Sequence, residues 1–303
     1  MIANFDELRA RARARGRARV AVVGADSATA LGAVLAAAAE GFAQPVLVGE
    51  EERIRALAAA RGLEVRHADW VPAVSPERAA ESAAALAGAG EVDVLLKGSL
   101  RTDQLLRAVL DRRHELRTGR LLSDVLLYED VLSGSKRLVG ITDGGINPAP
   151  DEAALRQIVA NAVELFRALG WDRPKVALLS ATEAVTEAVA STVVARRLQE
   201  DPGGLGECDV AGPLALDNAL VAEAARAKGI GGPVAGRADI LAVPGIEAGN
   251  VLGKSVKYFG ASITAHVVVG ARVPVLIPSR VESEADKLHS IALGVLVAGE
   301  LGA

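Results

Sequence analysis

The segment EAGNVLGKSV, residues 247–256, ends in Gly253-Lys254-Ser255, the residue types that close a phosphate-binding P-loop. A complete P-loop has four residues between its first glycine and the Gly-Lys pair, because that length wraps backbone N–H groups around a phosphate. Ala248 occupies the position of the first glycine here. No later apolar run ends in an aspartate suited to hold the Mg²⁺ of a nucleoside triphosphate. The segment therefore predicts a Gly-Asn turn beside a lysine, an anion site of another kind.

Four further polar clusters follow apolar runs that are expected to be strands. Ligands of open α/β sheets bind beyond the carboxyl ends of the strands, so these clusters hold the candidate binding residues. Cations and hydroxyls close to Gly or Pro suit a phosphate-bearing ligand that needs no metal. With those of the first segment, the candidates are Lys97, Thr102, Thr142, Asp143, Asn147, Asp217, Asn218, Glu247, Asn250, Lys254, Ser279, Arg280 and Asp286.

Other site motifs are missing from the sequence. The first predicted strand is followed by GADSAT, with Asp26 where a dinucleotide-binding loop has its second glycine. The four histidines show no metal-ligand spacing, so no metal site is expected. No G-x-S-x-G nucleophile elbow occurs. Cys208, the only cysteine, has no base beside it in the sequence and is interpreted as structural.

The composition argues against nucleic acid and membranes as partners. The 303 residues carry a net charge of −4, and the one Arg-rich stretch, residues 9–19, has arginine at every second position. On a helix this spacing scatters the charges around the axis, so a solvated N-terminal helix is expected. No apolar run has the length of a membrane span or the character of a signal core. With one cysteine and no intramolecular disulfide, we expect a cytoplasmic protein.

Short apolar runs alternate with alanine-rich stretches along the chain. Residues 20–24, 30–42 and 45–49 predict a strand, a helix and a strand, which together form a βαβ unit. The uninterrupted apolar strands predict a parallel sheet covered on both faces. Further strands are expected within 92–98, 121–129, 137–150, 175–180, 239–245 and 272–279, and helices from 151, over 182–199 and from 283. We expect two α/β domains with mainly parallel sheets, formed by 1–147 with 272–303 and by 148–271.

Five segments together resemble the phosphate acetyl/butyryltransferase family, with the longer phrases closer to its butyryltransferase branch. In chain order they are LKGSLRTDQLLRAVL, GITDGGINPAPDEAALRQI, GPLALDNAL, ADILAVPGIEAGNVLGKSVKYF and PSRVESEADKLHSIALGV. The resemblance implies a fold of the isocitrate/isopropylmalate dehydrogenase type with the active site in an interdomain cleft. It implies the reaction acyl-CoA + phosphate ⇌ acyl phosphate + CoA, by direct transfer in a ternary complex. Coenzyme A is then a substrate, no cofactor is tightly bound, and the protein is a homodimer.

The resemblance assigns the final motif to catalysis. Arg280 would bind phosphate oxygens in a bidentate manner. The Ser279 hydroxyl would donate to the tetrahedral oxyanion, and Asp286 would take the thiol proton when acyl-CoA is made. SEAD, residues 283–286, is also a capping box that opens the last helix, so Asp286 is either a base or a cap.

The remaining candidates become substrate ligands or helix caps. The resemblance makes Lys97 and Lys254 ligands of phosphate or of the CoA phosphates. Thr142 and Asp143 are expected to cap the turn that follows them, and Asp217-Asn218 to open a helix, because such side chains bond to nearby backbone N–H groups.

One position departs from the family pattern. Asp124 stands where the family often has histidine, and a carboxylate cannot donate a hydrogen bond to an anion at neutral pH. A catalytically weak acyl-CoA or acyl-phosphate binding protein is therefore the alternative function. A dehydrogenase on the same fold would need several metal-binding aspartates on one helix, and the sequence has no such set.

Overall fold

The computed structural model describes residues 1–132, 137–279 and 281–301, which divide into two compact units. The first unit comprises Met1–Phe5 and Leu121–Thr264, and the second comprises Asp6–Arg120 and the chain from Ala265 onward. The units change over at Leu121 and Ala265, whereas the sequence-based division places these points at 148 and 272. The difference at Leu121 arises because the two strands that follow it pair with each other and with a later strand of the first unit.

The second unit contains a six-stranded arrangement in the order β3-β2-β1-β4-β11-β10. Its strands are β1 (Ala18–Val23), β2 (Ala43–Gly49), β3 (Asp69–Pro72), β4 (Val94–Lys97), β10 (Thr264–Val269) and β11 (Val275–Leu276). Neighbouring strands are parallel except β10 and β11, which are antiparallel. The predicted βαβ unit is confirmed, because β1 and β2 pair in parallel on either side of a helix.

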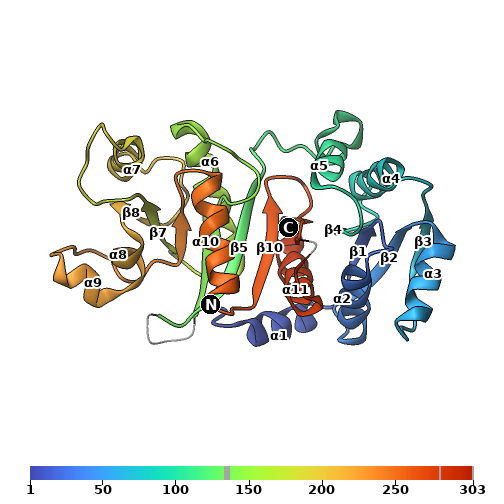
Figure 1. The fold of residues 1–303 in the computed structure, drawn as a ribbon. Coiled ribbons are helices and arrows are strands. Elements are labelled where there is room, and N and C mark those ends of the chain that lie inside the picture. The colour runs from blue at the N-terminus through green and yellow to red at the C-terminus, as the bar shows by residue number, and fades with distance from the viewer. Residues whose placement is uncertain (133–136, 280, 302–303) are drawn as a thin grey trace. The chain divides into compact units, whose positions relative to one another are not determined.

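Helices, several of them rich in alanine, cover the strands of the second unit. They are α1 (Phe5–Arg15), α2 (Ala28–Ala39), α3 (Glu51–Ala60), α4 (Pro76–Gly88), α5 (Thr102–Leu110) and α11 (Glu284–Leu301), with a 3₁₀ turn at Arg112–His114. Figure 1 shows α2 and α11 on one side of these strands and α4 and α5 on the other. Helix α4 buries five alanines and no larger side chain, which lets it lie close to the sheet. The N-terminal helix ends at Arg15, so only part of the arginine-rich stretch is helical.

The first unit has the strand order β5-β6-β9-β7-β8. Its strands are β5 (Ser123–Asp130), β6 (Arg137–Thr142), β7 (Lys175–Leu179), β8 (Asp209–Leu214) and β9 (Ile240–Ala242). Its helices are α6 (Glu152–Ala168), α7 (Ala190–Glu200), α8 (Leu216–Leu220), α9 (Ala222–Ala227) and α10 (Ile246–Tyr258). Strands β5 and β6 are antiparallel and the other pairs are parallel. The α/β class with mainly parallel strands is therefore confirmed.

The helix predicted over 182–199 begins only at Ala190, so that prediction is wrong at its start. The preceding residues form turns that Thr192 holds: its hydroxyl donates to the carbonyls of Thr186 and Val189 and accepts from the Thr186 N–H. A side-chain partner for the backbone thus competes with the helix. Among the described residues, no helix has both the length and the apolarity to cross a membrane.

The predicted Gly-Asn turn within 247–256 is wrong, because the whole segment belongs to α10. Gly249 and Gly253 are four residues apart and therefore lie on one face of the helix. A Cβ at Gly249 would lie 2.7 Å from the Asp143 carbonyl oxygen, and one at Gly253 would lie 2.9 Å from a methyl of Leu126. These glycines are explained by the close approach of the helix to the loop after β6 at Gly249 and to β5 at Gly253.

Candidate functional site

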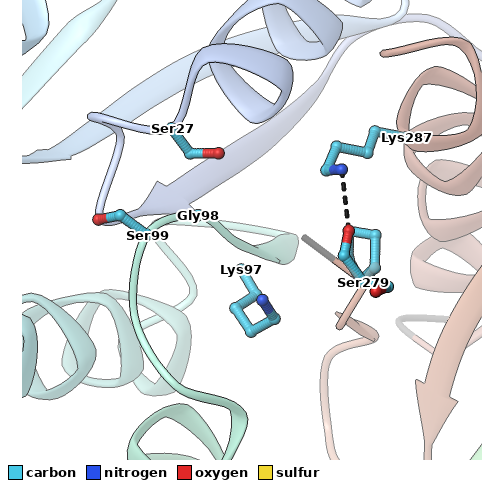
Figure 2. Close-up of a pocket in the computed structure, with 7 residues that line it drawn as sticks. Ser27, Lys97, Gly98, Ser99, Ser279 and Lys287 are labelled. Atoms are coloured by element: carbon cyan, nitrogen blue, oxygen red, sulfur yellow. Dashed lines mark hydrogen bonds between the residues drawn. The ribbon is translucent and has the colours of Figure 1, made fainter. Parts of the chain in front are cut away.

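A pocket of about 300 Å³ lies within the second unit (Figure 2). Its lining includes two lysines and three serines. The lining residues are Ser27, Lys97, Gly98, Ser99, Pro278, Ser279 and Lys287. They come from the start of α2, from the end of β4 and its loop, and from the segment between β11 and the first turn of α11. The carboxyl ends of parallel strands meet here, as expected for a ligand site in an α/β sheet.

Lys97 is the last residue of β4 and is only 5% exposed. The strand pairs with β1 on one side and β11 on the other, which fixes the position of this lysine. Gly98 follows it, and a Cβ there would lie 2.0 Å from the Gly24 carbonyl oxygen, so only glycine lets the two loops pass each other. A buried lysine at a strand end places a cation at the pocket with little freedom to leave it.

Ser27 is the N-cap residue of α2, yet its hydroxyl makes no capping hydrogen bond. Figure 2 shows this hydroxyl directed across the pocket toward Lys287. The first N–H groups of a helix lack partners within the helix and carry a partial positive charge, so such a terminus favours anions. Ser99 is turned away from the pocket centre and donates to Asp26.

Lys287 contributes the second cation and is 2% exposed. Its Nζ donates to the carbonyl oxygens of Ser279, at 3.1 Å, and Glu282, at 2.7 Å. Two lysines, the serines Ser27 and Ser279 and a helix N-terminus therefore surround one pocket. This arrangement suits an anion with several oxygens, which cations and N–H or O–H donors bind together.

Of the predicted catalytic residues, Ser279 lines the pocket and Arg280 lies outside the described residues. Asp286 is fully buried at the first turn of α11 and is not part of the described lining. Its Oδ2 accepts from the Ser283 N–H at 3.0 Å and from the Ser283 hydroxyl at 2.5 Å, and its own N–H donates to that hydroxyl at 3.1 Å. The capping-box geometry predicted for SEAD is therefore present.

A second cluster of polar side chains lies in the first unit, in the loop after β6. The Asp143 carboxylate accepts hydrogen bonds from the N–H groups of Gly145 and Ile146, at 2.8 and 2.9 Å, and from the Asn147 amide at 2.6 Å. Asp143 thus caps its turn as predicted, whereas the Thr142 hydroxyl donates instead to the Asp124 carbonyl oxygen at 2.8 Å.

Asp124 and Asp143 are both buried, at 3% exposure each. The antiparallel β5–β6 register pairs Leu126 with Ile141, which brings these two aspartates opposite each other two residues further along. Burial raises the pKa of Asp143, and the nearby Asp124 carboxylate raises it further, while the three hydrogen-bond donors lower it. The Asp124 carboxylate therefore adds to the effect of burial and favours the protonated form of its neighbour.

The other predicted ligands of the first unit are spread over two elements. Asp217 and the buried Asn218 lie in the first turn of α8, where a helix start was predicted, and Asn218 donates to Glu183. Lys228 contacts Glu183 at 2.8 Å and Asp217 at 3.2 Å. Asn250 and Lys254 are exposed on α10, and the Asn250 amide donates to the Gly144 carbonyl at 3.3 Å.

Thr102 begins α5 and is half-buried, outside the pocket lining. Sequence reasoning missed Ser27, Ser99 and Lys287 as pocket residues. For Lys287 a signal existed: a lysine in the first turn of a helix opposes the helix dipole, so it needs another reason to be there. Cys208 is half-buried, and this burial raises the pKa of its thiol to about 11, which agrees with a structural role.

The fold and the pocket define an α/β protein with two buried lysines at a strand-end pocket. A family model described as phosphate acetyl/butaryl transferase matches residues 73–295. The chain therefore belongs to this family of phosphate acyltransferases.

Individual relatives and a solved structure agree with this assignment. A phosphate butyryltransferase of Clostridium beijerinckii is 38% identical over 300 residues, which are 98% of this chain and 99% of the relative. A phosphate acetyltransferase of Rhizobium meliloti is 41% identical over 89% of this chain and 85% of the relative. A branched-chain phosphotransacylase of Enterococcus faecalis has a similar structure, with a TM-score of 0.82 and 31% identity over 93% of this chain and 99% of the other.

Proposed function

We propose that this protein transfers a short acyl group between coenzyme A and inorganic phosphate, by direct transfer within a ternary complex. The observation that carries the proposal is the pocket of the second unit, which is lined by Lys97, Lys287, Ser279 and the α2 N-terminus with its N-cap Ser27. Inorganic phosphate matches this set, because it presents several oxygens to cations and donors at once. The membership of an acyltransferase family supports an enzyme over the alternative, a weak binding protein.

The transfer needs an oriented phosphate, stabilisation of an oxyanion and movement of one proton. In the proposal, Lys97, Lys287 and Arg280 hold the phosphate so that one oxygen faces the thioester carbonyl. The Ser279 hydroxyl donates to the oxygen that becomes negative when phosphate attacks. Bringing two bound substrates together in the right orientation supplies several kcal/mol of the barrier reduction, so no covalent enzyme intermediate is needed.

The predicted residues outside the pocket lining have the following roles in the proposal. Asp286 is assigned first to the α11 cap, which its hydrogen bonds with Ser283 support, and the role of base for the CoA thiol stays a prediction. Thr102, Thr142, Asp143, Asp217, Asn218, Asn250 and Lys254 stay predicted substrate ligands. The isocitrate/isopropylmalate dehydrogenase-like arrangement implied by the family resemblance likewise stays a prediction.

A phosphate-dependent assay of CoA release with acetyl-, propionyl- and butyryl-CoA tests the proposed reaction. We expect release with at least one of them, and none when phosphate is omitted, because phosphate is the attacking group. The preferred chain length emerges from the ratio of kcat/KM values. Measurable binding of CoA without release from any of the three would favour the binding protein instead.

We also propose that the protein is a homodimer that uses the exposed apolar side chains of α10 and the residues after it. Val251, Tyr258, Phe259 and Ile263 are 65%, 64%, 91% and 46% exposed. Tyr258 and Phe259 follow Val251 by seven and eight residues, so these three side chains lie on one face near the C-terminal end of α10. Clustered apolar side chains of this kind are typical of protein interfaces, and a second copy of the chain fits the two-fold symmetry most oligomers have.

A further inference from the structure

The short connection between β11 and α11 carries Ser279, and it is held by its own Glu282 and by side chains from β10 and α11. The Glu282 Oε1 atom accepts a hydrogen bond from the Ser279 N–H at 3.0 Å. The Glu282 N–H in turn donates to the Ser279 carbonyl oxygen at 3.2 Å. Glu282 therefore bonds to both backbone polar groups of Ser279: its carboxylate accepts from the N–H, and its own N–H donates to the carbonyl oxygen.

Two further groups restrict Glu282. The His266 Nε2 atom, on β10, lies 3.4 Å from the same Oε1 atom, and the two side chains are 18% and 9% exposed. Lys287 donates to the carbonyl oxygens of Ser279 and Glu282 from the other side. The connection is thus bound to β10 through His266 and to α11 through Lys287.

We propose that Glu282 is a positioning residue for the proposed acyl transfer, and that it acts through Ser279. Burying a carboxylate is costly unless it is hydrogen-bonded, and Glu282, at 8% exposure, is hydrogen-bonded to the Ser279 N–H. The contact it makes is with the backbone of the residue whose hydroxyl lines the anion pocket. The inference builds on the proposed function, since Ser279 has its role only in that reaction.

The physical reason lies in how a hydroxyl is aimed. The direction of the Ser279 hydroxyl depends on the orientation of its own peptide, because the side chain has one rotatable bond before the oxygen. Loss of the Glu282 carboxylate leaves the peptide N–H without its acceptor and lets the connection shift. A misplacement of about 1 Å from a distant change lowers the rate about 100-fold.

The experiment compares Glu282→Ala, Glu282→Gln and Ser279→Ala with the double variant and with wild type, in the full-length protein. Glu284→Ala is the matched control, because Glu284 lies two residues away with its side chain 41% exposed. Each variant is assayed for kcat and KM with the best acyl-CoA and for melting temperature. Hydrogen–deuterium exchange is followed at the Ser279 amide.

We expect Glu282→Ala to lower kcat about 100-fold with little change in KM for acyl-CoA or in melting temperature. Glu282→Gln should stay within about threefold of wild type, because its amide oxygen accepts the same N–H. The double variant should match Ser279→Ala within about twofold, since residues that act as a unit are not additive. Glu284→Ala should match wild type.

Wild-type kcat in Glu282→Ala, or effects of the two single variants that multiply in the double variant, would overturn the proposal. The exchange measurement separates this failure from failure of the proposed function. The Ser279 amide should exchange about tenfold faster in Glu282→Ala than in wild type, whether or not any acyl-CoA is consumed. Equal exchange in the two proteins overturns the positioning contact itself.

Discussion

At the scale of single residues, the last motif shows how one stretch of sequence serves two purposes. Ser279 reaches the pocket, and four residues later Ser283 and Asp286 close the first turn of α11. The cap was readable from sequence because its S-x-x-D spacing is local. The placement of Ser27 and Lys287 on one pocket was not, because these residues lie on helices that are far apart in the chain.

The dual interpretation of Asp286 leads to a test with two substitutions. Asp286→Ala removes the acceptor for the Ser283 N–H and should lower the free energy of unfolding by about 1 kcal/mol. Asp286→Asn keeps an acceptor oxygen and should remain closer to wild type in a urea titration. Turnover of the Asn variant then reports on the base role, because asparagine cannot accept a thiol proton. An Ala variant as stable as wild type would contradict the capping contribution.

Glu183 provides a prediction of pH dependence. Its hydrogen bond with Lys228, followed by backbone and Asn218 hydrogen bonds, lowers its pKa from 4.5 to about 2. A carboxyl whose pKa is lower in the folded state stabilises the fold above its unfolded pKa. That contribution is lost as the pH falls from about 4.5 toward about 2. The melting temperature of Glu183→Gln should therefore decrease less than that of wild type between pH 5 and pH 3.

The control for this measurement is Glu187→Gln, an exposed glutamate of the same loop. It should show the same acid-dependent decrease as wild type. Identical pH profiles for Glu183→Gln and wild type would mean that the Lys228 contact does not contribute to stability.

At the scale of elements, α10 shows where sequence patterns fail. Gly-Asn and Gly-Lys pairs are typical of turns, yet here both glycines lie inside a helix. Tertiary contacts explain the presence of glycine here: the backbone of the loop after β6 passes within 3 Å of the position that a Cβ would have at Gly249. The parallel strands were predictable because each is a continuous apolar run, whereas the contact that selects these glycines comes from residues about a hundred positions earlier.

Gly249→Ala tests this account of α10. Alanine favours a helix over glycine by about 1 kcal/mol. The new methyl group, however, would lie 2.7 Å from the backbone of Asp143 and Gly144, and forcing an extra group into packed structure costs about 1–3 kcal/mol. We expect a net loss of stability in thermal unfolding. Ala248→Ser, at the exposed neighbouring position, serves as control and should change little; a stabilised Gly249→Ala would show that the loop yields.

At the scale of the whole molecule, the predicted binding residues are distributed over both units. The second unit contains the anion pocket, and the first contains most of the predicted ligands that lie outside its lining. The sequence predicted the α/β class and the alternation of elements, because these follow from local periodicity. It could not predict which strand ends form a pocket, because that depends on a strand order in which β4 and β11, distant in sequence, are neighbours.

The proposed dimer is testable by substitution on α10. Wild-type protein at micromolar concentration should have the mass of two chains in light scattering. Phe259→Asp, which places a charge at a side chain that is 91% exposed, should shift the mass toward one chain. Val74→Asp, at an exposed valine of the second unit, should leave the dimer intact. A monomeric wild type would refute the proposal.

The half-buried thiol of Cys208 has a practical consequence for anyone who measures this reaction. With a pKa of about 11, it is almost entirely uncharged near neutrality, and thiolate is the form that attacks disulfide dyes. A colorimetric reagent added to the enzyme will therefore report free coenzyme A against a nearly silent protein background. The same residue can also serve as a probe of local opening. The rate at which the dye reacts with Cys208 in the absence of substrate would report how often that edge of the first unit opens.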